Sequence, residues 1–110
     1  MKKEFFKETT VLASDSCEQI LKYYLLTGCV SEEYCDLMVY GIEIDREVRT
    51  NGRKRERDKK VIRDLFFVKE EAEDFLQKIF EKKVTPTELR FAVREYIGEK
   101  LQVGNMKISR

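Results

Sequence analysis

The sequence predicts an α+β fold, in which an antiparallel β-sheet of three or four strands carries two C-terminal helices packed on one face. Three observations predict it. Apolar and polar side chains alternate with period two over residues 38–48, as in a strand with one buried face. Asn51-Gly52 follows as a hairpin turn signal. From residue 68 onward, apolar residues recur every three or four positions, which is the period of an amphipathic helix.

The composition is typical of a highly charged soluble domain. The chain has 110 residues with 22 Lys plus Arg and 21 Asp plus Glu, so 39 % charged residues leave a net charge of only +1. No apolar run reaches the roughly 18 residues that a membrane span needs. With 42 % hydrophobic residues, five Gly and one Pro, the chain is neither disordered nor collagen-like. We therefore predict a single domain over residues 1–110.

The sequence predicts no metal or cofactor. Histidine, the commonest general base and metal ligand at neutral pH, does not occur in the chain. The three cysteines, Cys17, Cys29 and Cys35, do not have the close spacing of the four ligands that structural zinc needs. The first residues are partly basic but include no apolar signal-peptide core. We therefore expect a cytoplasmic protein with reduced thiols.

Two strands are predicted before the hairpin turn. Residues 19–27 are rich in aromatic and aliphatic side chains and end at the turn signal Thr27-Gly28. In the second strand the even positions form the buried face: Met38, Tyr40, Ile42, Ile44, Arg46 and Val48. Gly41 lies on the polar face and indicates a bulge or a close backbone approach. Residues 1–16 are compatible with an edge strand, a short helix or a docked arm.

Charges beside the turn predict the register of a basic hairpin over residues 46–60. A two-residue loop would set like charges opposite each other in three pairs: Asp45 and Asp58, Arg46 and Arg57, Glu47 and Glu56. A three-residue loop over residues 50–52 gives three pairs of opposite charge: Asp45 with Arg57, Arg46 with Glu56, Glu47 with Arg55. We therefore predict the three-residue loop, with Gly52 in the left-handed conformation. The strands then form a β-meander over residues 17–67.

A helical pair is predicted over residues 68–101. The apolar stripe of its first helix consists of Val68, Ala72, Phe75, Leu76, Ile79 and Phe80. Thr85, Pro86 and Glu88 open the second helix as a capping box with proline in the first turn. The apolar face of this helix consists of Leu89, Ala92, Val93, Tyr96, Ile97 and Leu101. The short link makes the helices antiparallel neighbours or a bent pair, and residues 102–110 are predicted to be a frayed tail.

The order of these motifs resembles a known group of proteins. The strand Tyr40-Gly41-Ile42-Glu43-Ile44 precedes a hairpin and a helix, and Thr85-Pro86-x-x-Leu89 opens a last helix that ends near Glu95-Tyr96-Ile97. This pattern, over residues 38–98, is similar to a family of short uncharacterised proteins from clostridia and related Firmicutes. The resemblance implies a domain of unknown function and transfers no site residues.

The basic hairpin is the first candidate site. Residues 46–60 include eight basic and three acidic side chains, a net charge of +5, whereas the other 95 residues have a net charge of −4. A basic β-ribbon can follow the phosphates of a nucleic acid. The candidate contacts for nucleic acid or another partner are Arg49, Arg53, Lys54, Arg55 and Arg57. A solvated hairpin with charges paired across its strands is the alternative, and no aromatic side chain is interleaved for base stacking.

The acidic stripe of Glu43, Asp45 and Glu47 could serve a hard cation or acid–base chemistry. We instead expect Arg55, Arg57 and Lys59 on the return strand to neutralise it, because no nucleophile–base pair accompanies it. The sequence therefore predicts no enzyme and no small-molecule ligand. Four tyrosines are interpreted as sheet packing: Tyr23, Tyr24, Tyr34 and Tyr40.

Apolar side chains outside the predicted core suggest self-association. Phe91 lies off the apolar face of its helix, and helices on one face of a sheet leave the other face bare. We place Leu37, Val39, Tyr23 and Leu25 on that bare face, and predict Leu37, Val39 and Phe91 as self-association residues. The leading prediction is a non-enzymatic protein-interaction or self-associating module, with a protein partner or a second copy in a homodimer. The alternative is a nucleic-acid-binding accessory or regulatory protein that uses the basic hairpin.

Overall fold

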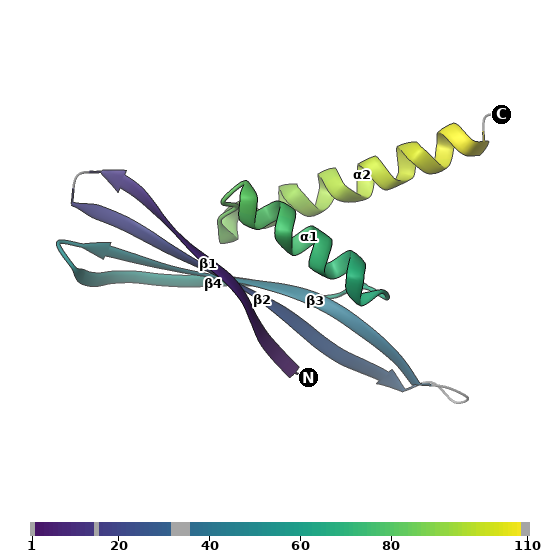
Figure 1. Ribbon diagram of the computed structural model, residues 1–110, viewed down its shortest axis with the longest axis horizontal. Helices are drawn as coiled ribbons and strands as arrows, with labels where there is room; N and C mark the ends of the chain where they lie inside the picture. Colours follow the sequence, from purple (N-terminus) through teal and green to yellow (C-terminus); the bar gives the residue numbers. More distant parts are fainter. Residues whose placement is uncertain (1, 15, 32–35, 109–110) are drawn as a thin grey trace.

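The computed structural model describes residues 2–14, 16–31 and 36–108, and in it the four strands form one antiparallel meander (Figure 1). The strands are β1 (Lys2–Ser14), β2 (Cys17–Ser31), β3 (Asp36–Thr50) and β4 (Arg53–Phe66). They are followed by helix α1 (Lys69–Glu81), a 3₁₀ turn η1 (Pro86–Glu88) and helix α2 (Leu89–Ile108). The predicted α+β fold is confirmed.

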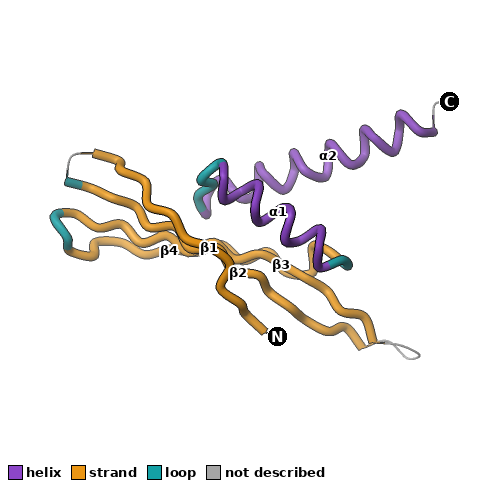
Figure 2. Tube along the Cα trace, viewed as in Figure 1, coloured by secondary structure: helices purple, strands orange, loops and turns teal. Residues whose placement is uncertain are grey.

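The sheet has the order β1-β2-β3-β4, so β1 and β4 are its edges. Within the segment that the sequence left open, residues 1–16, the edge strand β1 covers Lys2–Ser14 and has a bulge between Phe5 and Lys7. Long strands occupy the first part of the chain, and the helices follow them (Figure 2). The helices lie on one side of the sheet, and α2 extends away from it toward the C-terminus (Figure 1).

The core lies between the sheet and the helices. Strands β2, β3 and β4 supply Leu21, Tyr23, Leu25, Ile42, Ile44 and Phe66, and α1 supplies Ala72, Phe75, Leu76 and Ile79. Each large apolar side chain buried in this way stabilises the fold by about 1.5–3 kcal/mol. The buried Tyr23 hydroxyl donates a hydrogen bond of 2.8 Å to the carbonyl of Val84, which ties the sheet to the link between the helices.

The predicted position of Tyr23 and Leu25 on the bare face is wrong. Both pair with core residues of β3, Tyr23 with Ile44 and Leu25 with Ile42, and therefore share the helix-covered face. The run of apolar residues in β2 has no clear alternation, so the sequence pattern alone did not distinguish its two faces.

The basic hairpin closes with a two-residue turn, so the predicted three-residue loop is wrong. Asn51 and Gly52 both have positive φ, 53° and 76°, as a type I′ turn requires, which confirms the left-handed Gly52. The pairing with β4 then shifts between Arg49 and Val48, because Arg49 pairs with Lys54 and Val48 with Glu56, which leaves one extra residue in β4. The resulting cross-strand pairs are again of opposite charge, but with other partners than predicted: Asp45 with Lys59, Arg46 with Asp58, Glu47 with Arg57. A bulge thus removes the like-charge pairs that a longer loop was expected to remove.

Gly41 confirms the expected close backbone approach. On either side of this glycine, Tyr40 pairs with Phe66 and Ile42 pairs with Ile62. Three residues of β4 therefore bulge opposite Gly41. A Cβ atom at position 41 would lie 2.9 Å from the Cα of Arg63 and would also clash with the Ile62 carbonyl oxygen. The glycine is required here because no side chain fits beneath the bulge.

The helices follow the predicted pattern with three exceptions. The Glu88 carboxylate accepts hydrogen bonds from the backbone N–H of Thr85, at 3.1 Å, and from its hydroxyl, at 2.8 Å, in the predicted capping box. Val68 is exposed because it precedes α1 in extended conformation, and Ile97 is exposed because α2 leaves the sheet before it. Helix α2 also continues to Ile108 through the predicted frayed tail, where Gln102, Met106 and Lys107 are residue types that favour helix despite Gly104.

Candidate interaction surfaces

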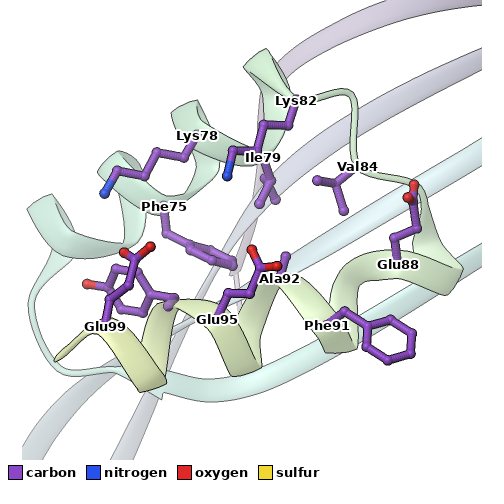
Figure 3. Close-up of a pocket in the computed structure, with 11 residues that line it drawn as sticks. Phe75, Lys78, Ile79, Lys82, Val84, Glu88, Phe91, Ala92, Glu95 and Glu99 are labelled. Carbon is purple, nitrogen blue, oxygen red and sulfur yellow. The ribbon is translucent and has the colours of Figure 1, made fainter. Parts of the chain in front are cut away.

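A groove with a volume of about 450 Å³ lies between α1 and the first half of α2 (Figure 3). Its apolar lining comes from both helices and the link between them: Phe75, Ile79, Val84, Phe91, Ala92 and Tyr96. The rings of Phe75 and Tyr96 meet edge to face at 5.2 Å and join the two helices at one end. The two helices and their connection therefore give the groove an apolar floor.

The two walls of the groove have opposite charge. Lys78 and Lys82 project from α1, whereas Glu95 and Glu99 project from α2 (Figure 3). Glu88 adds a further carboxylate at the start of the α2 side. In the part of the chain that the structure describes, none of these five side chains forms an ion pair within 4.0 Å. Lys82, Glu95 and Glu99 are thus available to a molecule that enters the groove, whereas the Glu88 carboxylate already accepts hydrogen bonds from Thr85 and the Lys78 ammonium group lies over the Tyr96 ring.

The predicted self-association residues do not form one surface. Phe91 is 61 % exposed and lines the groove. Leu37 is 43 % exposed but lies in β3, opposite Val30 in β2. Val39 is only 3 % exposed, because it lies in a central strand and packs over Gly28. Of the three, only Phe91 is placed in the groove, and Val39 is too buried to contact a partner.

The structure divides the five predicted basic contacts into two groups. Three are held by carboxylates: Arg49 by Glu47 at 2.6 Å, Lys54 by Glu47 at 3.9 Å and Arg57 by Asp45 at 3.5 Å. Arg53 and Arg55 are exposed at the start of β4, and neither forms an ion pair with another described residue. Much of the hairpin's charge is therefore paired, and its tip keeps two free arginines.

The acidic stripe is buried on the face of the sheet opposite the helices. Glu43 and Asp45 are only 4 % and 5 % exposed. Lys3 of β1 reaches across β2 and lies 2.6 Å from Glu43, a partner that the sequence analysis missed because only the sheet register brings residues 3 and 43 together. The predicted neutralisation is confirmed for Arg57 on Asp45, although Arg55 forms no ion pair with the stripe in the described structure.

Burial and mutual contact separate the pKa values of the two buried carboxyls. Burial, together with a hydrogen bond to the Glu43 carboxylate, raises the pKa of Asp45. Burial also acts to raise the pKa of Glu43, but hydrogen bonds from Lys3 and Asp45 outweigh it and lower that pKa. Asp45 Oδ1 is buried and has no hydrogen-bond partner among the described residues, which agrees with a carboxyl that is costly to ionise at this position.

The remaining candidate features are quickly placed. No three His, Cys, Asp or Glu side chains among the described residues are grouped so as to hold a metal ion. Cys17 is half-buried and Cys29 exposed, both as free thiols, and Cys35 and Tyr34 lie outside the described residues. Tyr23 and Tyr40 pack in or against the core, and Tyr24 contacts Phe5 on the opposite face. Within the described ranges, no helix has the length and apolar character to cross a membrane.

Together these features define a small α+β protein with an antiparallel meander, an apolar groove between two helices and a charged hairpin. The chain belongs to a family of unknown function, DUF6514, which it matches over residues 1–99. No curated protein and no solved structure matches it. The predicted membership of a family of unknown function is thus confirmed, whereas the clostridial and Firmicutes origin and the Tyr40-Gly41-Ile42-Glu43-Ile44 motif as its signature stay predictions.

Proposed function

We propose that this protein is a non-enzymatic interaction module and that the groove between α1 and α2 binds an amphipathic helix of a partner protein. The observation that carries the proposal is the groove's apolar floor between one basic and one acidic wall. Helix-in-groove recognition uses apolar side chains spaced at three and four residues, which insert between two receptor helices.

The charges of the walls specify the partner. A helix whose apolar stripe is flanked by acidic residues on one side and basic residues on the other would place each flank against the opposite charge. Such complementarity selects among partners and excludes helices with two like flanks. Phe91 supplies the aromatic side chain at the edge of the groove, and exposed aromatic residues of this kind often dominate binding energy.

Three synthetic helical peptides with one apolar stripe test this proposal. One has mixed flanks, one only glutamate flanks and one only lysine flanks. We expect the mixed peptide to bind most tightly in fluorescence anisotropy. The Phe91→Ser variant should weaken its binding by about tenfold or more.

Phe67→Ser is the matched control, because Phe67 is 71 % exposed and does not line the groove. This variant should bind the mixed peptide as the wild type does. Absence of binding by all three peptides, or equal loss in both serine variants, contradicts the proposal. Preference for one of the uniformly charged peptides would show a different partner chemistry and would also contradict it.

The free arginines at the hairpin tip support a second candidate function, nucleic-acid binding. Arg53 and Arg55 are exposed in a segment whose net charge is +5. Phosphate contacts by such side chains release counterions, so binding should be strongest at low salt. Duplex and single-stranded probes at about 50 mM salt should then bind the wild type and lose affinity for the Arg53→Glu/Arg55→Glu/Arg57→Glu variant.

A control with the same change in net charge separates the hairpin from a general charge effect. Lys69→Glu/Arg90→Glu/Arg94→Glu alters three exposed basic residues of the two helices. Equal loss in both triple variants, or no binding by the wild type, would exclude the hairpin as a nucleic-acid site.

A further inference from the structure

The edge strand β1 has an unoccupied side along its backbone. It has only β2 as a neighbour in the sheet that the described residues form, and it is 13 residues long. The N–H and C=O groups on the outer side of an edge strand can pair with another extended chain. The helices pack on the face of the sheet, so they leave this edge accessible (Figure 1).

The charges along β1 are complementary to themselves in the antiparallel direction. A second copy with the symmetry axis between Phe5 and Phe6 would place Lys3 opposite Glu8 and Glu4 opposite Lys7. The symmetry repeats both pairs, so every charged position from 3 to 8 faces the opposite charge. Cross-strand pairs of this kind favour a register, and like pairs disfavour it.

The bulge in β1 makes this pairing consistent with the two faces of the sheet. Residues 3 and 8 would lie on opposite faces of a regular strand, because side chains alternate. The register shift between Phe5 and Lys7 instead pairs Lys3 with Leu26 and Glu8 with Lys22, on one face of β2. Partners that lie opposite each other in a sheet share a face, so the bulge is what permits these contacts.

The same shift aligns the second charge pair. Glu4 pairs with Leu25 and Lys7 with Tyr23, both on the helix-covered face of β2. Glu4 and Lys7 of two copies could therefore meet on that face. The same bulge thus serves both pairs, one on each side of the sheet.

Lys7 already donates to Gln77 at 2.6 Å and Glu4 lies 3.1 Å from Lys2, but an ammonium group has three donors and a carboxylate has two acceptor oxygens, so both can make the new contact as well. Glu8 is exposed and forms no ion pair with another described residue. Lys3 contacts Glu43 but keeps 44 % of its side chain exposed, and an ammonium group has three donors. The Phe5 ring, 57 % exposed and edge-on to Tyr24, lies next to the symmetry axis and would be covered.

We propose that a second copy of this chain pairs antiparallel with β1, with Lys3 opposite Glu8 and Glu4 opposite Lys7, to form a continuous eight-stranded sheet. The two-fold axis runs perpendicular to the sheet, so both helix pairs lie on the same side. This surface is distinct from the groove, and each dimer would present two grooves in one direction.

An exchange of charge between Glu4 and Lys7 tests the proposal. Glu4→Lys places lysine against Lys7 of the second copy, and Lys7→Glu places glutamate against Glu4. Sedimentation velocity over the micromolar range should show a wild-type dimer and about tenfold or more weaker association of each variant alone. An equimolar mixture of the two variants restores opposite charges at both positions, so it should form a heterodimer with wild-type affinity.

The mixture also separates loss of pairing from loss of folding, because an unfolded variant could not be rescued by its counterpart. Glu56→Lys makes the same charge change on the exposed face of β4 and should leave the dimer intact. A wild type that stays monomeric throughout, or a dimer that neither variant weakens, overturns the proposal. Peptide binding at the groove is measured independently, so failure here leaves the proposed function unaffected.

Discussion

The two edge strands of this sheet, β1 and β4, differ in how readily their unpaired backbone groups can pair with another chain. Strand β4 contains two bulges. One lies near the hairpin turn, where the pairing with β3 shifts between Val48 and Arg49, and the other lies opposite Gly41. Six basic and two acidic residues occupy its first eight positions, 53–60, a net charge of +4. Bulges and lysine-rich surfaces both discourage a strand from pairing with another chain.

Strand β1 is shifted against β2 at two places, between Phe5 and Lys7 and between Leu12 and Ser14, and its charged residues are complementary to those of a second copy of itself. Its helix-face residue Lys7 donates a hydrogen bond of 2.6 Å to Gln77 of α1, which holds the strand beneath that helix. The same kind of backbone irregularity therefore has different consequences at the two edges. In β4 the bulges interrupt the regular edge of the strand, whereas in β1 the shift between Phe5 and Lys7 brings residues of complementary charge onto the same face.

The largest effect is expected from breaking the β4 bulge at its base. Gly41→Ala would set a Cβ atom against the backbone of Ile62 and Arg63, and backbone cannot move aside as a flexible side chain can. We expect the free energy of unfolding to fall by about 2–3 kcal/mol, measured by urea denaturation.

Gly28→Ala provides the control for this substitution. The added methyl group would lie 3.5 Å from Val39 Cγ2, an ordinary van der Waals contact. This variant should keep or slightly raise stability, because alanine loses less conformational entropy than glycine in a strand. Equal destabilisation by both substitutions would show that the bulge imposes no special constraint.

A second, intermediate effect is expected from the buried carboxyls of β3, because Glu43 pairs with Lys3 of the edge strand β1 and Asp45 pairs with Arg57 of the edge strand β4. Asp45 faces Lys22 of β2, Lys3 of β1 and Arg57 of β4, and contacts Glu43 of its own strand. Because burial and Glu43 raise its pKa, the folded protein binds its proton more tightly than the unfolded chain does. This contribution is fully present below the ordinary carboxyl pKa, near 4, and is lost as the pH rises through the raised value.

Asp45→Asn removes this titration and keeps an N–H donor toward Glu43. We expect the variant to be more stable than the wild type at pH 7 and to lack the decline in unfolding free energy above pH 4. Glu43 acts in the opposite direction, because its lowered pKa stabilises the fold above the ordinary value and loses that contribution on acidification. Identical pH profiles of unfolding free energy for the wild type and Asp45→Asn would contradict the raised pKa of Asp45.

The smallest effect is expected from a single ion pair at the β4 edge. Arg46 donates two hydrogen bonds to the Asp58 carboxylate, at 2.8 and 3.1 Å, but both side chains are partly exposed to solvent. Asp58→Asn should therefore cost only about 0.5 kcal/mol of unfolding free energy at low salt. Glu4→Gln at the β1 edge, where the Lys2 partner is exposed, should show no measurable change, and a larger loss there would reverse the comparison.

Local signals predicted much of the fold because each depends on neighbouring residues. The alternation over residues 38–48, the Asn51-Gly52 turn and the Thr85–Glu88 capping box all correspond to observed elements. The need for glycine at position 41 was also visible, as a residue without a side chain within a strong strand pattern. Of the candidate groove, only Phe91 was indicated, as an apolar residue on the polar side of its helix.

The tertiary structure decided what depends on residues far apart in the chain. The sequence by itself determined that the hairpin charges must pair with opposite signs, but a bulge and a longer loop both satisfy that condition, and the sheet adopts the bulge. Only the register across three strands brings Lys3 to Glu43 and buries Asp45 beside them. Local pattern specifies strands and turns through short-range sterics, whereas burial and partner choice follow from which strands become neighbours.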